Sequence, residues 1–145
     1  MTNILMAVFL AAVAGMAVSI QSPLASILNQ RVGQIESVFI VHLGGTVVSG
    51  IILLFLSGGN MRAWRSAPWY TWLAGVLGLV VIASLNIAIL RLGSAATTVV
   101  MVTINITLGA ILDHFGWLGL EVRPMTLPRI IGMVVMGLGA WLVVR

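Results

Sequence analysis

Long apolar runs, separated by short polar or glycine-containing breaks, dominate the chain. They predict five helices, at residues 4–28, 37–56, 69–90, 94–112 and 129–144. About 20 apolar residues, rising 1.5 Å each, are needed to cross the roughly 30 Å hydrocarbon core of a bilayer. None of the runs alternates apolar and polar residues as barrel strands do. We therefore predict an all-α membrane protein, with five transmembrane helices in a single domain, residues 1–145.

Turn residues mark where these helices begin and end. Gly58-Gly59-Asn60 closes the second run, and Pro68 precedes the third. Ser94 is a candidate N-cap for the fourth run. The first run could instead be a signal peptide. It has no basic segment before it and is too long for a signal-peptide core, so we expect a true span.

The composition sharpens the membrane assignment. Hydrophobic residues make up 61% of the chain, and only seven arginines and three acidic residues are charged. A soluble domain has about a quarter of its residues charged. With no cysteine, the chain has no disulfide and no thiolate metal site. The arginines are scattered singly and form no basic stripe for nucleic acid.

The arginines carry information about orientation. Five spans place the two termini on opposite sides of the membrane. Four arginines then lie on the N-terminal side and three on the other, namely Arg62, Arg65, Arg123 and Arg129 against Arg31, Arg91 and Arg145. A difference of one arginine between the two sides determines the orientation in the membrane only weakly. Either one loop dominates and the topology is single, or both orientations insert and pair as an antiparallel dimer. We favour the second interpretation.

A few polar residues lie within the predicted spans, where they must be paired or must face water or substrate. The candidate substrate-binding residues are Gln21, His42, Asn86 and Asn105. Gln21 precedes Pro23, which frees the carbonyl of Ser19. That carbonyl either contacts the substrate or belongs to an ordinary proline kink and accepts a hydrogen bond from a nearby serine. For His42 the alternative is a neutral ring hydrogen-bonded between helices.

Charged residues are confined to span ends and loops. Without a carboxylate in mid-span, a nucleophile–base pair or a metal cluster, we expect no enzyme activity, no cofactor and no bound metal. The loop from Asp113 to Pro128 is interpreted as structural, with Asp113 pairing with Arg129 or capping backbone groups; a gate is the alternative. His114 lies where a helix C-terminus favours it.

Several stretches together resemble the YdcZ-like branch of the drug/metabolite transporter superfamily. They are Leu112 to Gly119 (LDHFGWLG), Arg123-Pro124, and Arg129 to Gly132. This chain departs from the family pattern at three places. The family often has Asn at the position of Ala25, Phe at the position of His42, and Gly-Gln at the positions of Ile104-Asn105. The resemblance implies half of a ten-helix inverted-repeat transporter, which must pair with another copy or a partner.

The resemblance also implies an exporter in the bacterial inner membrane. We therefore predict a multi-pass transporter of an unidentified small molecule, in contact with membrane lipid, acting as an antiparallel homodimer by alternating access. The alternative is a non-transporting membrane scaffold or a regulatory subunit of a hetero-oligomer. A membrane-embedded enzyme ranks third.

Overall fold

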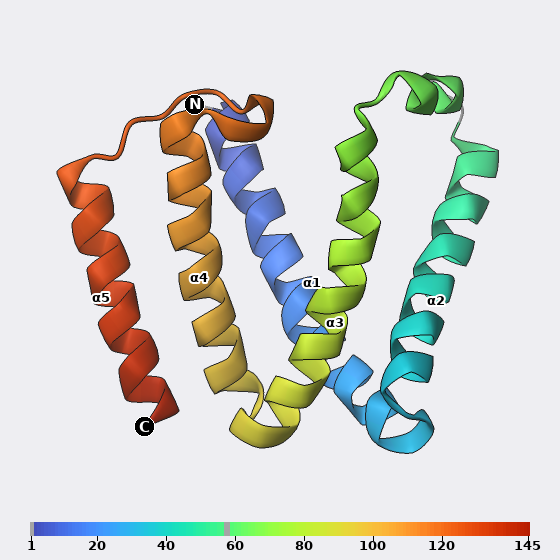
Figure 1. Cartoon of the computed structure of the whole chain (residues 1–145), viewed down its shortest axis with the longest axis horizontal. Helices are drawn as coiled ribbons and strands as arrows, with labels where there is room; N and C mark the ends of the chain where they lie inside the picture. Colours follow the sequence, from blue (N-terminus) through green and yellow to red (C-terminus); the bar gives the residue numbers. More distant parts are fainter. Residues whose placement is uncertain (1, 57–58) are drawn as a thin grey trace. The chain divides into compact units, whose positions relative to one another are not determined.

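Helices form almost all of the computed structural model, which describes residues 2–56 and 59–145. The long helices are α1 (Thr2–Val32), α2 (Gln34–Phe55), α3 (Leu73–Leu92), α4 (Ser94–Phe115) and α5 (Leu127–Val144) (Figure 1). Short 3-10 turns are η1 (Met61–Ser66), η2 (Trp69–Trp72) and η3 (Trp117–Gly119). Within this described part, five helices are long and apolar enough to cross a membrane. The predicted all-α, five-span fold is confirmed.

Single glycines make two of the helix connections. Gly33 joins α1 to α2 and Gly93 joins α3 to α4, with φ values of 103° and 80°. Glycine adopts such positive φ without a Cβ clash. The predicted N-cap was therefore one residue off: Gly93 holds the cap position, and Ser94 is the first helical residue.

The helices also run past several predicted ends. α1 continues to Val32 instead of 28, and α2 begins at Gln34 instead of 37. Polar residues in these extra turns can lie in the headgroup region, where helices continue beyond the hydrocarbon. Gly58 and the Arg62 side chain, both used in the sequence predictions, lie outside the described residues.

The chain divides into two compact units, residues 1–87 and 88–145. In the first unit, α1 packs on α2. Asn86 of α3 is hydrogen-bonded to Ser26 of α1 and to Ser37 of α2. Buried groups at this meeting point include Ala25, Ser26, Ser37, Val38 and Asn86. Small residues at such contacts let helix backbones approach closely where lipid provides no hydrophobic drive.

The second unit is built on the neighbouring helices α4 and α5. Gly116, with φ 62°, ends α4 in the left-handed conformation typical of a helix C-terminus. The connection then folds back onto α4: the Arg123 N–H donates to the Asp113 carbonyl oxygen at 2.8 Å. The Met125 N–H donates to His114 Nδ1 at 3.0 Å.

Of the two roles expected for Asp113, pairing with Arg129 is not found among the described side chains. Among the described side chains, which leave out that of Arg62, the structure has one ion pair, between Arg123 and Glu121 at 3.0 Å, and both of these side chains are well exposed. Asp113 stabilises the connection through its backbone carbonyl, while its carboxylate makes no hydrogen bond among the described groups. Glu121 and Arg123 are two residues apart in the connection, which brings their side chains within reach of each other.

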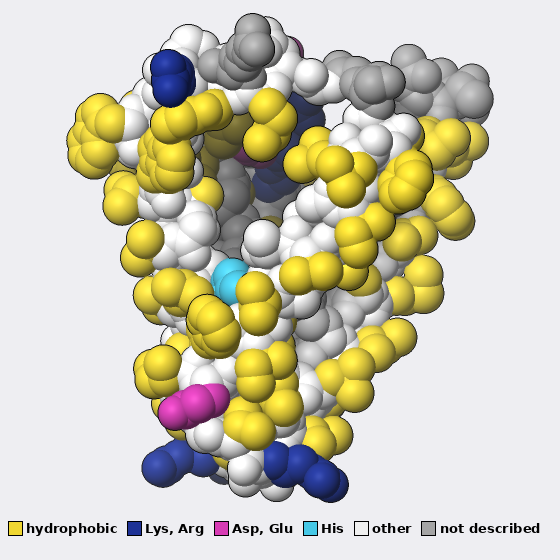
Figure 2. Space-filling view, turned by 90° about the vertical axis from the view of Figure 1, so that its right-hand side faces the viewer, with side chains coloured by type: hydrophobic (Ala, Val, Ile, Leu, Met, Phe, Trp, Pro, Cys, Tyr) yellow, Lys and Arg dark blue, Asp and Glu magenta, His cyan; other side chains and the backbone are white. Residues whose placement is uncertain are grey.

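Most of the surface is apolar. Figure 2 shows a face covered largely by hydrophobic side chains, with a histidine visible on it. Large aliphatic and aromatic residues are exposed along all five long helices. Such a surface is stable in contact with lipid, as the composition predicts.

Candidate membrane-embedded polar site

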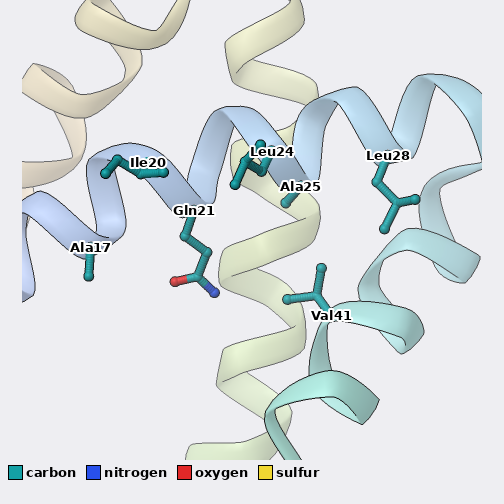
Figure 3. A pocket seen from close by; sticks show the side chains of 7 residues that line it. All are labelled: Ala17, Ile20, Gln21, Leu24, Ala25, Leu28 and Val41. Carbon is teal, nitrogen blue, oxygen red and sulfur yellow. The ribbon is translucent and has the colours of Figure 1, made fainter.

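Gln21 lies on a pocket of about 390 Å³ formed by α1 and α2. The other lining residues are apolar: Ala17, Ile20, Leu24, Ala25, Leu28 and Val41. Gln21 and Val41 point toward one another across it (Figure 3). Gln21 is 11 residues from the helix end at Val32, about 16 Å along the axis. Its exposed amide has no hydrogen-bond partner among the described residues.

The proline beside this pocket leaves α1 helical. The Ser22 hydroxyl donates to the Val18 carbonyl at 2.8 Å, one residue before the Ser19 carbonyl that Pro23 deprives of its helical donor. No side-chain hydrogen bond to the Ser19 carbonyl is found among the described residues. A free backbone acceptor thus lies one turn or less from Gln21.

His42 lines a second pocket of about 390 Å³ between α2 and α3, with Phe39, Leu79 and Ala83 among its apolar neighbours. Its Nδ1 is 2.9 Å from the carbonyl oxygen of Val38, one turn earlier on the same helix. A carbonyl oxygen only accepts, so Nδ1 carries the proton in this arrangement. In the neutral ring, Nε2 is then a free acceptor. A Cβ placed on Gly78 of α3 would lie 3.2 Å from this nitrogen.

The hydrogen bond of His42 is therefore within its own helix. This differs from the alternative of a ring bonded between helices. Gly78 provides the notch that lets the ring lie against α3 without a side chain in its way. His42 is the one polar residue among those lining this pocket, so its ring is the lining group that can form a hydrogen bond with a substrate.

Asn86 is fully buried at the junction of α1, α2 and α3. Its Nδ2 donates to Ser37 Oγ at 3.3 Å, and Ser37 Oγ donates to the Ala25 carbonyl oxygen at 3.0 Å. Ser26 Oγ is 3.5 Å from the Asn86 carbonyl oxygen, at the limit of a hydrogen bond. The Asn86 Oδ1 atom is buried without a partner. This amide thus joins the three helices through a buried contact.

A second amide at this junction was not among the predicted site residues. Gln34 Nε2 donates to the Ala83 carbonyl oxygen at 2.7 Å, and its Oε1 is buried without a partner. Gln34 lies three residues before Ser37 on α2, and Ala83 lies three residues before Asn86 on α3, so this is a second hydrogen bond between the same two helices. The apolar run placed the start of α2 at 37, which left Gln34 outside the predicted span.

Asn105 lies in the second unit, near the middle of α4. It is exposed, and its side chain has no hydrogen-bond partner among the described residues. The neighbouring Thr103 and Thr107 hydroxyls bond to carbonyls one turn earlier on α4. Of the four predicted substrate residues, two therefore line separate pockets, one is buried in a helix junction and one is free on α4. Their shared role stays a prediction.

A third pocket, of about 530 Å³, lies between α4 and α5. Its lining residues are Ile106, Gly109, Ala110, Asp113, Arg129, Gly132, Met133 and Met136. Asp113 and Arg129 both line it without forming an ion pair. Across the described chain, no three His, Asp or Glu side chains gather as metal ligands do.

Comparison with known proteins identifies the family. Residues 6–142 match a family model described as "Putative inner membrane exporter, YdcZ". Searches of curated proteins and of solved structures found no match. The five spans and apolar surface agree with a multi-pass membrane protein. Because the match covers nearly the whole chain, the chain belongs to the YdcZ family of the drug/metabolite transporters, as the sequence resemblance predicts.

Proposed function

We propose that the chain exports a small molecule across the bacterial inner membrane as an antiparallel homodimer working by alternating access. Gln21, His42 and Asn105 contact the substrate in this proposal. Asn86, which is fully buried, positions α3 against α1 and α2. Membership in an exporter family supports transport as the activity.

The observation that carries the proposal is the pair of unpartnered amides in mid-membrane. Gln21 is exposed on α1, and Asn105 is exposed on α4, 11 residues after the helix begins at Ser94. An amide left without a hydrogen bond in an apolar medium costs about 1–3 kcal/mol by mutational measurements. Such groups within spans face a cavity, a substrate or another subunit. Gln21 and Asn105 are therefore the amides from which we expect a substrate or a second copy of the chain to take a hydrogen bond.

The charge balance supports pairing in opposite orientations. Four arginines against three give neither orientation a clear advantage. Two copies related by a two-fold axis in the membrane plane would present the same residues to both sides in turn. Arg31→Gln changes the count to four against two and should shift insertion toward one orientation. Arg65→Gln with Arg123→Gln changes it to two against three and should shift insertion the other way.

The site is tested by ligand-dependent stabilisation of the purified protein. Thermal unfolding is measured across a panel of metabolites, and a stabilising compound is loaded into proteoliposomes to measure its efflux. Gln21→Leu and Asn105→Leu should each abolish the stabilisation and the efflux. Gln30→Leu is the matched control because Gln30 is exposed at the end of α1, outside the pocket. Unchanged stabilisation in Gln21→Leu and Asn105→Leu would refute the site.

One observation favours the scaffold alternative. Asn86 is buried and hydrogen-bonded to Ser37 between two helices, as expected of a residue that serves only assembly. A scaffold would show no stabilisation by any metabolite. In that case Gln21→Leu would be harmless or stabilising, because it removes an unpaired amide from lipid.

A further inference from the structure

The groove between α4 and α5 combines two free charges with an apolar floor. Asp113 near the end of α4 and Arg129 near the start of α5 both line it. Gly109, Ala110 and Gly132 leave the space between the helices open, and the groove has a volume of about 530 Å³. It lies wholly within the second unit.

The two charges are available to a ligand. Asp113 and Arg129 form no ion pair with each other or with another described residue. Neither the Asp113 carboxylate nor the Arg129 guanidinium takes part in a hydrogen bond among the described side chains. A carboxylate accepts hydrogen bonds from an ammonium group, and a guanidinium donates two parallel hydrogen bonds to a phosphate. Opposite charges in one groove are therefore complementary to a zwitterion.

The polarity of the groove along its length points to a lipid. From Asp113 to Ile106, and from Arg129 to Met136, the lining extends seven residues, about 10 Å, toward the middle of each span. The charges lie at the helix ends, where headgroups are found, and Met133, Met136 and Ile106 lie deeper. A small soluble zwitterion would leave this apolar length empty, whereas an acyl chain fills it.

We propose that this groove binds an aminophospholipid, with its phosphate on Arg129, its ammonium group on Asp113 and an acyl chain along the glycine-lined floor. The site is separate from the Gln21 and His42 pockets and does not depend on what the protein transports. A basic residue at a membrane surface strengthens anionic headgroup binding about fivefold. A carboxylate beside it adds selectivity for a headgroup that carries an ammonium donor.

The test uses purified, delipidated protein and three lipids with identical acyl chains. Phosphatidylethanolamine, phosphatidylcholine and phosphatidylglycerol are titrated while bound lipid is counted by native mass spectrometry. Phosphatidylethanolamine should bind most tightly. Arg129→Gln should weaken its binding about fivefold, and Arg129→Lys should largely restore it. Asp113→Asn should remove the preference for phosphatidylethanolamine over phosphatidylglycerol.

Arg123→Gln is the matched control. Arg123 is an exposed arginine in the connection between α4 and α5, but it pairs with Glu121 and lies outside the groove. Lipid binding to this variant should stay within about twofold of the unsubstituted chain, the effect of a typical exposed charge. Equal binding of the three lipids, equal losses in Arg123→Gln and Arg129→Gln, or a headgroup preference that persists in Asp113→Asn would each overturn the proposal.

A second copy of the chain is the competing occupant of the groove. The chain has no cysteine, so Ala110→Cys introduces a single thiol on the groove floor. If a lipid fills the groove, oxidation in native membranes should leave this variant monomeric on a denaturing gel. An efficient disulfide-linked dimer would show that a second copy covers the groove, and the lipid assignment would be wrong.

Discussion

Ser37→Ala should destabilise the protein far more than the loss of one hydroxyl suggests. Ser37 is fully buried, and its Oγ connects α1 to α3 by accepting from Asn86 Nδ2 and donating to the Ala25 carbonyl oxygen. The substitution removes both hydrogen bonds and leaves the Asn86 Nδ2 without a partner. Because Asn86 Oδ1 is already unpaired, the whole amide would then be buried unsatisfied.

The expected cost follows from these contacts. Two hydrogen bonds between membrane helices contribute about 0.6 kcal/mol each on average. A newly orphaned buried amide N–H adds about 1–3 kcal/mol. Ser37→Ala should therefore lower the free energy of unfolding by about 2–4 kcal/mol. Ser26→Ala is the matched control, since Ser26 is 2% exposed but its single bond to Asn86 is 3.5 Å long. It should cost about 0.5 kcal/mol or less.

Unfolding in mixed micelles of a mild detergent and dodecyl sulfate, followed by circular dichroism, measures these differences. In the background of Asn86→Leu, which removes the orphaned amide, Ser37→Ala should lose most of its effect. The resulting coupling between Ser37 and Asn86 should exceed about 1 kcal/mol. Equal costs for Ser37→Ala and Ser26→Ala, or additive effects in the double variant, would refute the reasoning.

Two further predictions concern backbone approach and the connection after α4. Gly78→Ala places a Cβ 3.2 Å from His42 Nε2, whereas Gly75→Ala meets nothing within 4 Å. Gly75→Ala should stabilise the protein by up to about 1 kcal/mol because alanine has a higher helix propensity. Gly78→Ala should lack this stabilisation because the new methyl group displaces the His42 ring. Thermal unfolding of the two variants measures the difference. His114→Ala removes the acceptor of the Met125 N–H, so that amide should exchange with deuterium several-fold faster, with α4 exchange unchanged. Equal melting temperatures for the two glycine variants, or unchanged exchange at Met125, would contradict these predictions.

The sequence was sufficient for the number and type of helices, because uninterrupted apolar runs have few structural alternatives. The runs could not locate every helix end. Gln34 precedes the predicted start of the second span at residue 37, yet it begins α2 and donates to the Ala83 carbonyl oxygen. A single glycine, Gly33, suffices to join α1 and α2, so the connection is shorter than the polar stretch around it.

Pairings of side chains were harder to predict than helices. For Asp113 the sequence left open an ion pair with Arg129 or capping of backbone groups. The described side chains show no such ion pair, and the backbone carbonyl of Asp113 accepts from the Arg123 N–H after the turn at Gly116. Helical spacing placed Asn86 at membrane depth without showing which face it occupies. Its burial against Ser37 depends on how α3 meets α2, and a single sequence contains no information on that contact.

The orientation of the chain tests the antiparallel dimer most directly. Ala67→Cys, before α3, and Ala95→Cys, in the first turn of α4, each give an otherwise cysteine-free chain one exposed thiol near opposite ends of α3. Intact spheroplasts are treated with a membrane-impermeant maleimide, and the labelled fraction is compared with that of lysed cells. With both orientations present, roughly half of the copies of each variant should react in intact spheroplasts. Complete labelling of one variant and none of the other would show a single orientation and contradict the antiparallel homodimer.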